Sequence, residues 1–290
     1  ATAGCAMAST SDWYKLTKLR ADGRRGEEVR AITVDLDRAA GVDGSAWVSM
    51  GQTTVLAQVR GPKEAARRAD EDAEAAVLVV TVTTAPFAYA NARQNVPSRA
   101  KERRDAEVAN CVRKALEATV ALNTYPKSVI EVRLQIASDD GSRFACCVNA
   151  AALALLDAGV ATHDLVVGAS VAVVADEVWF DPTRRERLHA ALLDVAVLPN
   201  LDLLVFADLD AAHRSLDLDE FDRLHAAARR AARLTAKHIH DIARELLARA
   251  IYVREVTAAL PPLKALTSLS HDDGRDEDDH PMDDAAPAAE

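Results

Sequence analysis

The chain has 290 residues and a mass of 31.1 kDa, and 49% of its residues are hydrophobic but only 4% aromatic. It is therefore long enough for one large domain or two fused halves, with a core built mainly from Ala, Val and Leu. No apolar run approaches the length that spans a bilayer, so we expect no membrane. The net charge of −10 is uneven, because nine acids and one arginine give residues 271–290 a charge of −8 and leave −2 for the rest. We predict a nearly neutral body followed by an acidic disordered tail over residues 266–290.

The N-terminal part predicts a lead-in followed by strands. Residues 1–16 lack the basic and apolar regions of a secretory signal and predict a flexible lead-in. Residues 29–37 and 45–60 alternate or run apolar around glycine-containing turns, which predicts three antiparallel strands. Residues 76–84 (AVLVVTVTT) are rich in β-branched residues and predict a further strand.

A helix is predicted over residues 98–122, after a loop over residues 85–97. Apolar side chains recur there at four-residue spacing, at Val108, Val112, Leu116 and Val120. The dipeptide Tyr125-Pro126 ends this helical pattern.

The next segment is the most informative one. A buried strand over residues 129–136 enters a polar turn over residues 138–143, and this turn opens a helix of small residues. The small residues of that helix predict that nearly every face of it can pack closely against backbone; they are Ala145, Cys146, Cys147, Ala150, Ala151, Ala152 and Ala154. A strand that feeds the turn Asp140-Gly141-Ser142-Arg143 at a helix N-terminus has the geometry to hold a phosphate by backbone N–H groups. An ordinary tight strand-to-helix turn is the alternative reading.

The second half repeats this order of elements. Strands are predicted over residues 165–174, 178–180, 192–198 and 201–206, with a turn or short helix at Asp181-Pro182-Thr183. A long amphipathic helix begins at Asp217, and Glu220 forms a capping-box pattern with it. Element order alone therefore predicts an α+β fold of two similar βαβ-type halves, about residues 17–160 and 161–250.

Metals and cofactors are not indicated. The cysteines Cys5, Cys111, Cys146 and Cys147 have no metal-like spacing and are expected to be thiols in a reducing compartment. His238 and His240 diverge on a helix because they are two residues apart. The sequence has no P-loop or dinucleotide glycine pattern, so we predict no cofactor and no metal.

Several spaced motifs resemble the RNase PH family over about residues 17–250. In order they are Arg20-x-Asp22-Gly23-Arg24, Asp43-Gly44-Ser45-Ala46, Gly51-x-Thr53, Gly61-Pro62, Tyr125-Pro126, Asn149-Ala150-Ala151 and Asp157-Ala158-Gly159. Within the family, LRADGRRGEEVR and ALNTYPKSVIEV resemble the exosome ring subunits of the ribosomal RNA-processing protein 41 type. The pair Cys146-Cys147 and the run Asp181-Pro182-Thr183 are more similar to the protein 46 type, the alternative.

The resemblance implies the RNase PH-like fold, also called the ribosomal protein S5 domain 2-like fold. It further implies a six-membered ring of related subunits with RNA-binding cap subunits, an associated hydrolytic exonuclease and single-stranded RNA in the channel. Active members of the family degrade RNA from the 3′ end with phosphate and release nucleoside diphosphates. On resemblance alone we expect the nucleus, the nucleolus and the cytoplasm as locations.

Two comparisons with active relatives predict that this chain is not catalytic. Their phosphate turn has the sequence Asp-x-Gly-Ser/Thr-Arg. Residues 139–143 match this pattern directly, which aligns Arg143 with the arginine of the relatives. An ungapped alignment from Asn149 instead places Phe144 at that arginine position, and the sequence leaves both alignments open. Counting back from Pro199 places Leu192 where they have a catalytic aspartate, and Asp194 lies two residues later, about 6–7 Å along a strand. We expect a non-catalytic ring subunit with at most a vestigial phosphate turn; an active phosphate-dependent 3′-5′ exoribonuclease is the alternative.

RNA contact is expected to persist. The resemblance places Arg103 and Arg104 where active relatives grip the RNA backbone, and adjacent guanidinium groups can contact successive phosphates. Arg67 and Arg68 follow Gly61-Pro62, where the family has a loop that faces the channel. The alternative is a set of solvated arginines, in which Arg103 pairs with Glu107 four residues later.

Overall fold

A computed structural model describes residues 19–37, 39–64, 72–88, 98–174, 177–187, 190–211 and 217–259. The predicted lead-in, the predicted tail, and Arg67 and Arg68 lie outside the described residues. No helix among the described residues is long and apolar enough to cross a membrane.

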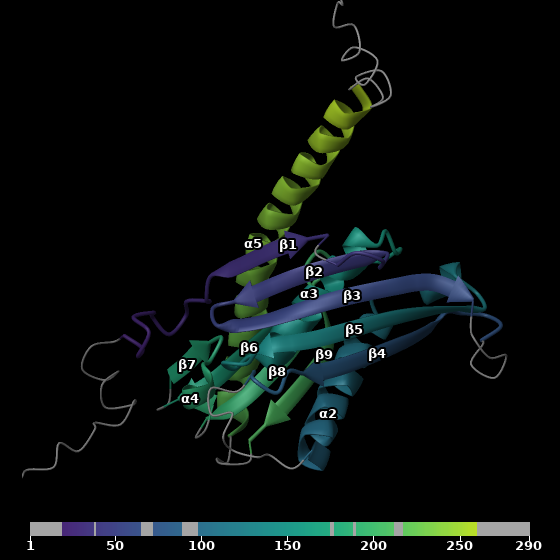
Figure 1. The fold of residues 1–290 in the computed structure, drawn as a ribbon. Helices are drawn as coiled ribbons and strands as arrows, with labels where there is room; N and C mark the ends of the chain where they lie inside the picture. The colour runs from purple at the N-terminus through teal and green to yellow at the C-terminus, as the bar shows by residue number, and fades with distance from the viewer. Residues whose placement is uncertain are drawn as a thin grey trace, which may run out of the picture. The chain divides into compact units, whose positions relative to one another are not determined.

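The first half contains a five-stranded sheet in the order β1-β2-β3-β5-β4 (Figure 1). Its strands are β1 (Ile32–Leu36), β2 (Gly44–Met50), β3 (Thr53–Glu64), β4 (Val77–Thr84) and β5 (Ser128–Ser138). As predicted, β1, β2 and β3 pair antiparallel. The strands β4 and β5 pair parallel, and helix α2 (Ser98–Glu117) connects them, so this half contains a βαβ unit.

The second half contains a four-stranded sheet in the order β7-β6-β8-β9. Its elements are β6 (Val167–Val174), β7 (Glu177–Phe180), the short helix α4 (Arg184–Arg187), β8 (Ala191–Leu198), β9 (Leu203–Asp210) and the long helix α5 (Leu218–Ala259). Every pair of named strands in this sheet is antiparallel, so the described part of this half contains no βαβ unit. The two halves are less alike than element order suggested.

Helix α3 (Arg143–Asp157) lies in the centre of the fold, with neighbours on two sides. A Cβ atom added to Gly44 of β2 would lie 2.5 Å from the carbonyl oxygen of Ala154, and one added to Gly168 of β6 would lie 2.9 Å from Cα of Ala145. All twelve residues from Phe144 to Leu155 are buried. The small side chains of this helix therefore let backbones from both halves approach it, as its composition predicted.

The other face of the second sheet packs against α5. Leu224, Ala228 and Ala232 of α5 form one buried cluster with β6 and β8 residues such as Val171 and Leu193. One of the two hydrogen bonds of the predicted capping box is present, since the backbone N–H of Asp217 donates to Oε2 of Glu220 at 3.4 Å. Residues from Glu245 onwards belong to a separate compact unit, in which the helix continues to Ala259.

Several predicted boundaries were wrong; the end of β3, for example, lies at Glu64 rather than at residue 60. Helix α2 ends at Glu117 rather than at residue 122, because residues 119–121 exchange backbone hydrogen bonds with residues 161–163 and a 3₁₀ turn (Leu122–Thr124) follows. Strand β9 ends at Asp210 rather than at residue 206. The acidic residues Asp208 and Asp210 interrupt the apolar pattern, but an edge strand tolerates them because its residues remain exposed.

Candidate functional site

The polar turn of residues 139–143 connects the end of β5 to the start of α3. Gly141 has φ +101°, and a Cβ atom added to it would lie 2.5 Å from the carbonyl oxygen of Pro182. Ser142 lies in the left-handed region, with φ 47°, and its hydroxyl donates to the same carbonyl at 3.2 Å. The segment between β7 and α4 therefore lies directly on the turn, which explains why this position requires glycine.

Backbone groups of the turn bind oxygen atoms of the chain itself. The N–H of Asp140 donates to Oγ1 of Thr53 at 3.1 Å, and the Thr53 hydroxyl donates to the carbonyl of Gly141 at 2.8 Å. The N–H of Gly141 donates to Oδ1 of Asp139 at 3.2 Å. Two N–H groups of the turn are thus already satisfied within the chain, one of them by a carboxylate.

The turn also carries two negative charges. Nε of Arg143 lies 3.8 Å from Oδ2 of Asp139, and Nη1 of Arg30 lies 3.7 Å from Oδ2 of Asp140. Partial burial and the nearby Asp139 raise the pKa of Asp140, although Arg30 opposes this shift. A phosphate bound here would meet both carboxyl groups as well as the arginines.

A buried ion pair between Arg30 and Asp181 fixes the covering segment. Nε and Nη2 of Arg30 donate to the two carboxylate oxygens of Asp181 at 2.7 and 2.6 Å, and the side chains are only 6% and 4% exposed. Burial alone would raise the pKa of Asp181, but the hydrogen bonds and charge of Arg30 outweigh it and hold that pKa below its usual value. Arg30 also donates to the carbonyl oxygens of Asp140 and Gly141, at 3.3 and 3.4 Å, so one side chain joins the turn to its cover.

A second buried arginine anchors the N-terminal segment to the same place. Nε of Arg20 donates to Glu186 at 3.0 Å, and Nη1 donates to the carbonyl of Phe180 at 2.6 Å. Its guanidinium lies 5.3 Å from the ring centroid of Trp179. Sequence reasoning used Arg20 only as part of a motif and did not assign roles to Arg30 or Glu186, because their partners lie more than 150 residues away.

Other motif residues also hold the fold together. Asn149 of α3 accepts from the N–H of Gly168 at 2.8 Å and donates to its carbonyl at 3.2 Å, which joins the two halves. Asp157, at the end of the same helix, accepts from the N–H of Ser45 at 2.8 Å, and Asp43 accepts from the N–H of Gly61 at 2.7 Å. These motif side chains therefore join backbone segments of the fold, Asn149 from a buried position and Asp43 from an exposed one.

Phe144, the second residue of α3, points into the interior. It is 6% exposed, and its ring centroid lies 5.2 Å from that of Phe206 on β9. Helix α3 runs unbroken from Arg143 through Asn149. The continuous helix is compatible with the ungapped count, and the choice between the two registers stays a prediction.

Asp194 lies in the middle of β8 with polar neighbours. Its carboxylate accepts a short hydrogen bond from the hydroxyl of Ser170 and lies 3.7 Å from Nη2 of Arg187, and its side chain is 15% exposed. Leu192, at the position expected for the catalytic aspartate, is buried beside Ala172 and Ala190.

The paired arginines lie on the exposed face of α2. Nε of Arg103 donates to Glu107 at 3.0 Å, and the Arg103 side chain remains 82% exposed. Arg104 is also exposed, whereas the next residue, Asp105, is buried and accepts from both the N–H and the hydroxyl of Thr84. The local ion pair that the sequence offered as the alternative for Arg103 is present. Because this pair is solvated, it leaves the guanidinium accessible.

The described cysteines are free thiols, as expected. Cys146 and Cys147 are fully buried in α3, and burial raises the pKa of Cys147 to about 12. Both are therefore neutral at physiological pH and contribute to packing.

Comparison with known proteins identifies relatives of both halves. The model for domain 1 of the 3′ exoribonuclease family, RNase PH, matches residues 28–161, and the model for its domain 2 matches residues 164–231. The "Exosome complex component Rrp41" of Pyrobaculum arsenaticum is 36% identical over 231 residues, which cover 79% of this chain and 89% of the relative. The "Exosome complex component RRP41 homolog" of Arabidopsis thaliana is 31% identical over 229 residues, with coverages of 78% and 92%.

Solved structures share the fold. Rice Rrp46 superposes with a TM-score of 0.65 at 25% identity, covering 79% of this chain and all of that one. A chain of the Archaeoglobus fulgidus exosome with RNA bound to the active site gives a TM-score of 0.66 at 22% identity, covering 78% and 94%. At that identity the second likeness concerns the fold alone.

Proposed function

Because this chain belongs to the 3′ exoribonuclease family of RNase PH type, we propose that it is an RNA exosome ring subunit that guides single-stranded RNA without cleaving it. The family and its RNase PH-like fold, both predicted from sequence, are confirmed by these matches. Relatives named as exosome components support the assembly. The proposal includes related subunits in a six-membered ring, RNA-binding cap subunits and an associated hydrolytic exonuclease as partners. It also includes residence in the nucleus, the nucleolus and the cytoplasm.

The state of the phosphate turn is the observation that carries the non-catalytic role. The N–H groups of Asp140 and Gly141 bind Thr53 and Asp139, and the Ser142 hydroxyl binds Pro182. A phosphate bound by the N–H of Gly141 would have to displace the Asp139 carboxylate from its hydrogen bond and lie near the Asp140 carboxyl group. Both steps cost free energy, because the displaced carboxylate loses its donor and like charges repel.

Two further features support the same role. The burial of Phe144 against Phe206 puts an apolar ring where the ungapped count expects an arginine. The buried side chain of Leu192 occupies the position where the catalytic aspartate is expected. Asp194, the nearest aspartate of β8, lies about 6–7 Å further along the strand. A catalytic group moved that far would not reach the same reacting atoms.

Phosphorolysis remains the second candidate, because one observation favours it. Arg143 is the first residue of α3 and lies beside the turn, as the literal Asp-x-Gly-Ser-Arg reading requires. On this reading Asp194 would act from its shifted position.

The direct test is phosphate-dependent release of nucleoside diphosphates from a 3′-single-stranded RNA. The chain is assayed alone and in a ring reconstituted with its related subunits, beside an Asp194→Ala variant. We expect no phosphate-dependent release by the chain alone, and the same rate from rings that carry wild-type chain or Asp194→Ala. Diphosphate release that Asp194→Ala abolishes would show that the chain is an active phosphorolytic enzyme.

RNA guidance is tested by the salt dependence of binding. Replacing Arg103 and Arg104 by alanine should weaken binding of a homopolymeric single-stranded RNA. It should also reduce the slope of log K against log salt by about 1.4, or 0.7 for each phosphate that an arginine no longer neutralises. Lys114→Ala is the control, since it removes an exposed cation from the other end of α2. A slope reduction of about 0.7 by this control, half the effect for half the charge removed, would mean that RNA responds to overall charge and not to the paired arginines.

A further inference from the structure

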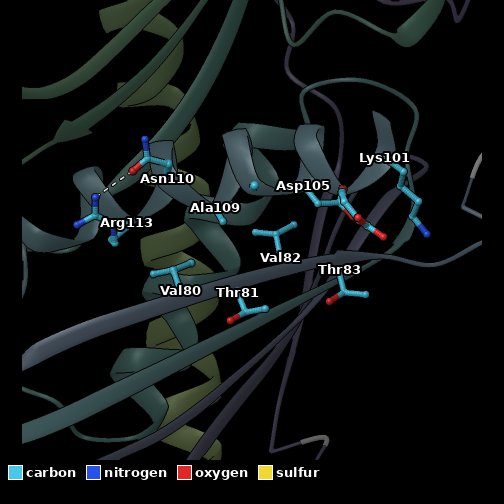
Figure 2. A pocket seen from close by; sticks show the side chains of 11 residues that line it. Val80, Thr81, Val82, Thr83, Lys101, Asp105, Ala109, Asn110 and Arg113 are labelled. Atoms are coloured by element: carbon cyan, nitrogen blue, oxygen red, sulfur yellow. Dashed lines mark hydrogen bonds between the residues drawn. The ribbon is translucent and has the colours of Figure 1, made fainter. Parts of the chain in front are cut away.

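The free edge of the first sheet borders a groove. Strand β4 is the last strand in its sheet, and helix α2 packs beside it. The groove has a volume of about 550 Å³ and is lined by residues 80–83 of β4 and by one flank of α2 from Lys101 to Arg113 (Figure 2). No role of this groove follows from the phosphate turn or from the paired arginines.

The lining shows that the groove follows the edge of the strand. The Thr84 side chain binds Asp105, so the even-numbered side chains of β4 point toward α2. Consecutive side chains in a strand point to opposite faces, so Thr81 and Thr83 point to the other side. A groove that contacts both sets must lie alongside the strand, in the place of a further strand.

The backbone of β4 offers hydrogen-bonding groups to this groove. The N–H of Ala85 donates to the carbonyl of Ile136 in β5, whereas the N–H of Thr84 donates to Asp105 in α2. Because successive N–H groups of a strand point in opposite directions, those of Val80 and Val82 point away from β5, as does that of Thr84. Asp105 therefore satisfies the last outward N–H, and the N–H and C=O groups of Val80 and Val82 face the groove.

The chemistry of the lining fits a polypeptide better than a nucleic acid. Val80 and Val82 form one wall, and Ala106 and Ala109 of α2 leave room for side chains between the helix and the strand. None of the groove's lining residues is aromatic, so no ring offers the stacking surface that single-stranded nucleic acid uses. A strand edge beside a helix, with Ala106 and Ala109 between them, is suited to strand addition. The polar lining residues of the helix would meet polar side chains of the added segment; they are Lys101, Glu102, Asp105, Asn110 and Arg113.

We propose that this groove binds an extended segment of a neighbouring ring subunit, which adds to β4 as a sixth strand. The proposal rests on the ring assembly proposed above and names the surface that would serve it. From Lys101 to Arg113 the helix rises about 18 Å at 1.5 Å per residue. That length corresponds to about five residues of extended chain at 3.3 Å each. Side chains of the segment that face Ala106 and Ala109 would be apolar.

Mutations in the groove test the proposal in rings reconstituted from this chain and its related subunits. Ala106→Arg fills the groove from an exposed helical position. Val80→Pro removes an N–H that faces the groove and keeps the bonds to β5, which an edge strand tolerates. The control is Ala118→Arg, the same substitution at an exposed position just beyond α2. We expect each groove variant to weaken ring assembly at least tenfold, measured by native mass spectrometry, and Ala118→Arg to assemble like wild type.

Amide hydrogen exchange distinguishes strand addition from simple contact. On ring assembly the N–H groups of Val80 and Val82 should become protected at least tenfold, with Thr81 and Thr83 already protected by β5 in the free chain. Uniform protection without this alternation would overturn strand addition, and so would protection produced by a homopolymeric RNA in place of the subunits.

Failure of the two proposals can be told apart. If the wild-type chain forms no ring, the proposed function fails. If it forms a ring that folded Ala106→Arg joins with unchanged affinity, only the groove proposal fails. A melting temperature equal to that of wild type shows that Ala106→Arg is folded, so the test does not depend on Val80→Pro.

Discussion

Breaking the ion pair between Arg30 and Asp181 should destabilise the protein strongly. Both side chains are nearly inaccessible, so Arg30→Met would leave a buried carboxylate without its compensating charge. Removal of one partner from such a pair costs about 3–5 kcal/mol in the free energy of unfolding. At about 2–4 °C per kcal/mol for a domain of this size, the melting temperature should fall by about 6–20 °C. Urea and thermal unfolding measure both quantities.

Two further variants make this prediction specific. The double variant Arg30→Met, Asp181→Asn contains no buried charge at this site, so it should regain part of the stability that Arg30→Met loses. Asparagine is chosen for position 181 because Asp181 has φ +49°, a conformation that asparagine tolerates. Arg233→Met breaks an exposed pair with Asp202, in which the side chains are 58% and 47% exposed, and should cost far less, because solvent screens this pair. If Arg30→Met costs no more than Arg233→Met, the argument from burial is refuted.

Three other measurements test the packing and the charges. Gly44→Ala would place a Cβ 2.4 Å from the backbone nitrogen of Ala158, and should cost about 1–3 kcal/mol in urea unfolding. Asn149→Ala should cost about 1–3 kcal/mol for each of the two buried Gly168 groups left unpaired, measured in the same way; a smaller loss would mean that water replaces the amide. The pKa of Asp181 is lowered in the folded state, so its stabilising contribution is complete above the unfolded value of about 3.9 and is lost as the pH falls through the folded value. In Arg30→Met the main group that opposes burial is gone, so burial raises the pKa of the Asp181 carboxyl. Thermal unfolding should therefore show the gap between wild type and this variant beginning to narrow above the unfolded value of about 3.9 and narrowing further below it.

Local patterns were sufficient to predict most of the elements. Alternation and β-branched residues located β1 to β5, because each of these strands has a buried face. The small residues of α3 predicted close backbone packing, and the approaches of Gly44 and Gly168 to that helix confirm it. The patterns failed where burial is weak, as at the exposed acidic end of β9, and where distant residues pair, as at residues 119–121.

The candidate site was less predictable, because its decisive contacts are long-range. A sequence does not show that Arg30 meets Asp181 or that Pro182 covers Gly141, since each pair is brought together only by the packing of the two halves. A signal was nevertheless present: Asp181 belongs to a run that we noted as a turn and as a family feature, without assigning it a partner. The roles assigned to Arg103 and Arg104 stay predictions, because an exposed arginine has similar surroundings in the free protein whether it binds RNA or is only solvated.

The motifs that reveal the family are, in this chain, mostly structural. Gly44 lets the backbone of α3 approach β2 closely, Asn149 joins α3 to β6, and Arg20 anchors the N-terminal segment. Such residues are needed by any member that keeps the fold, whether or not it cleaves RNA. The residues that would distinguish an active member are Phe144 and Asp194, whose positions relative to the family depend on register. A chain can therefore retain every recognisable motif and still lose phosphorolysis, so the resemblance is strong evidence for the fold and the assembly but not for the reaction.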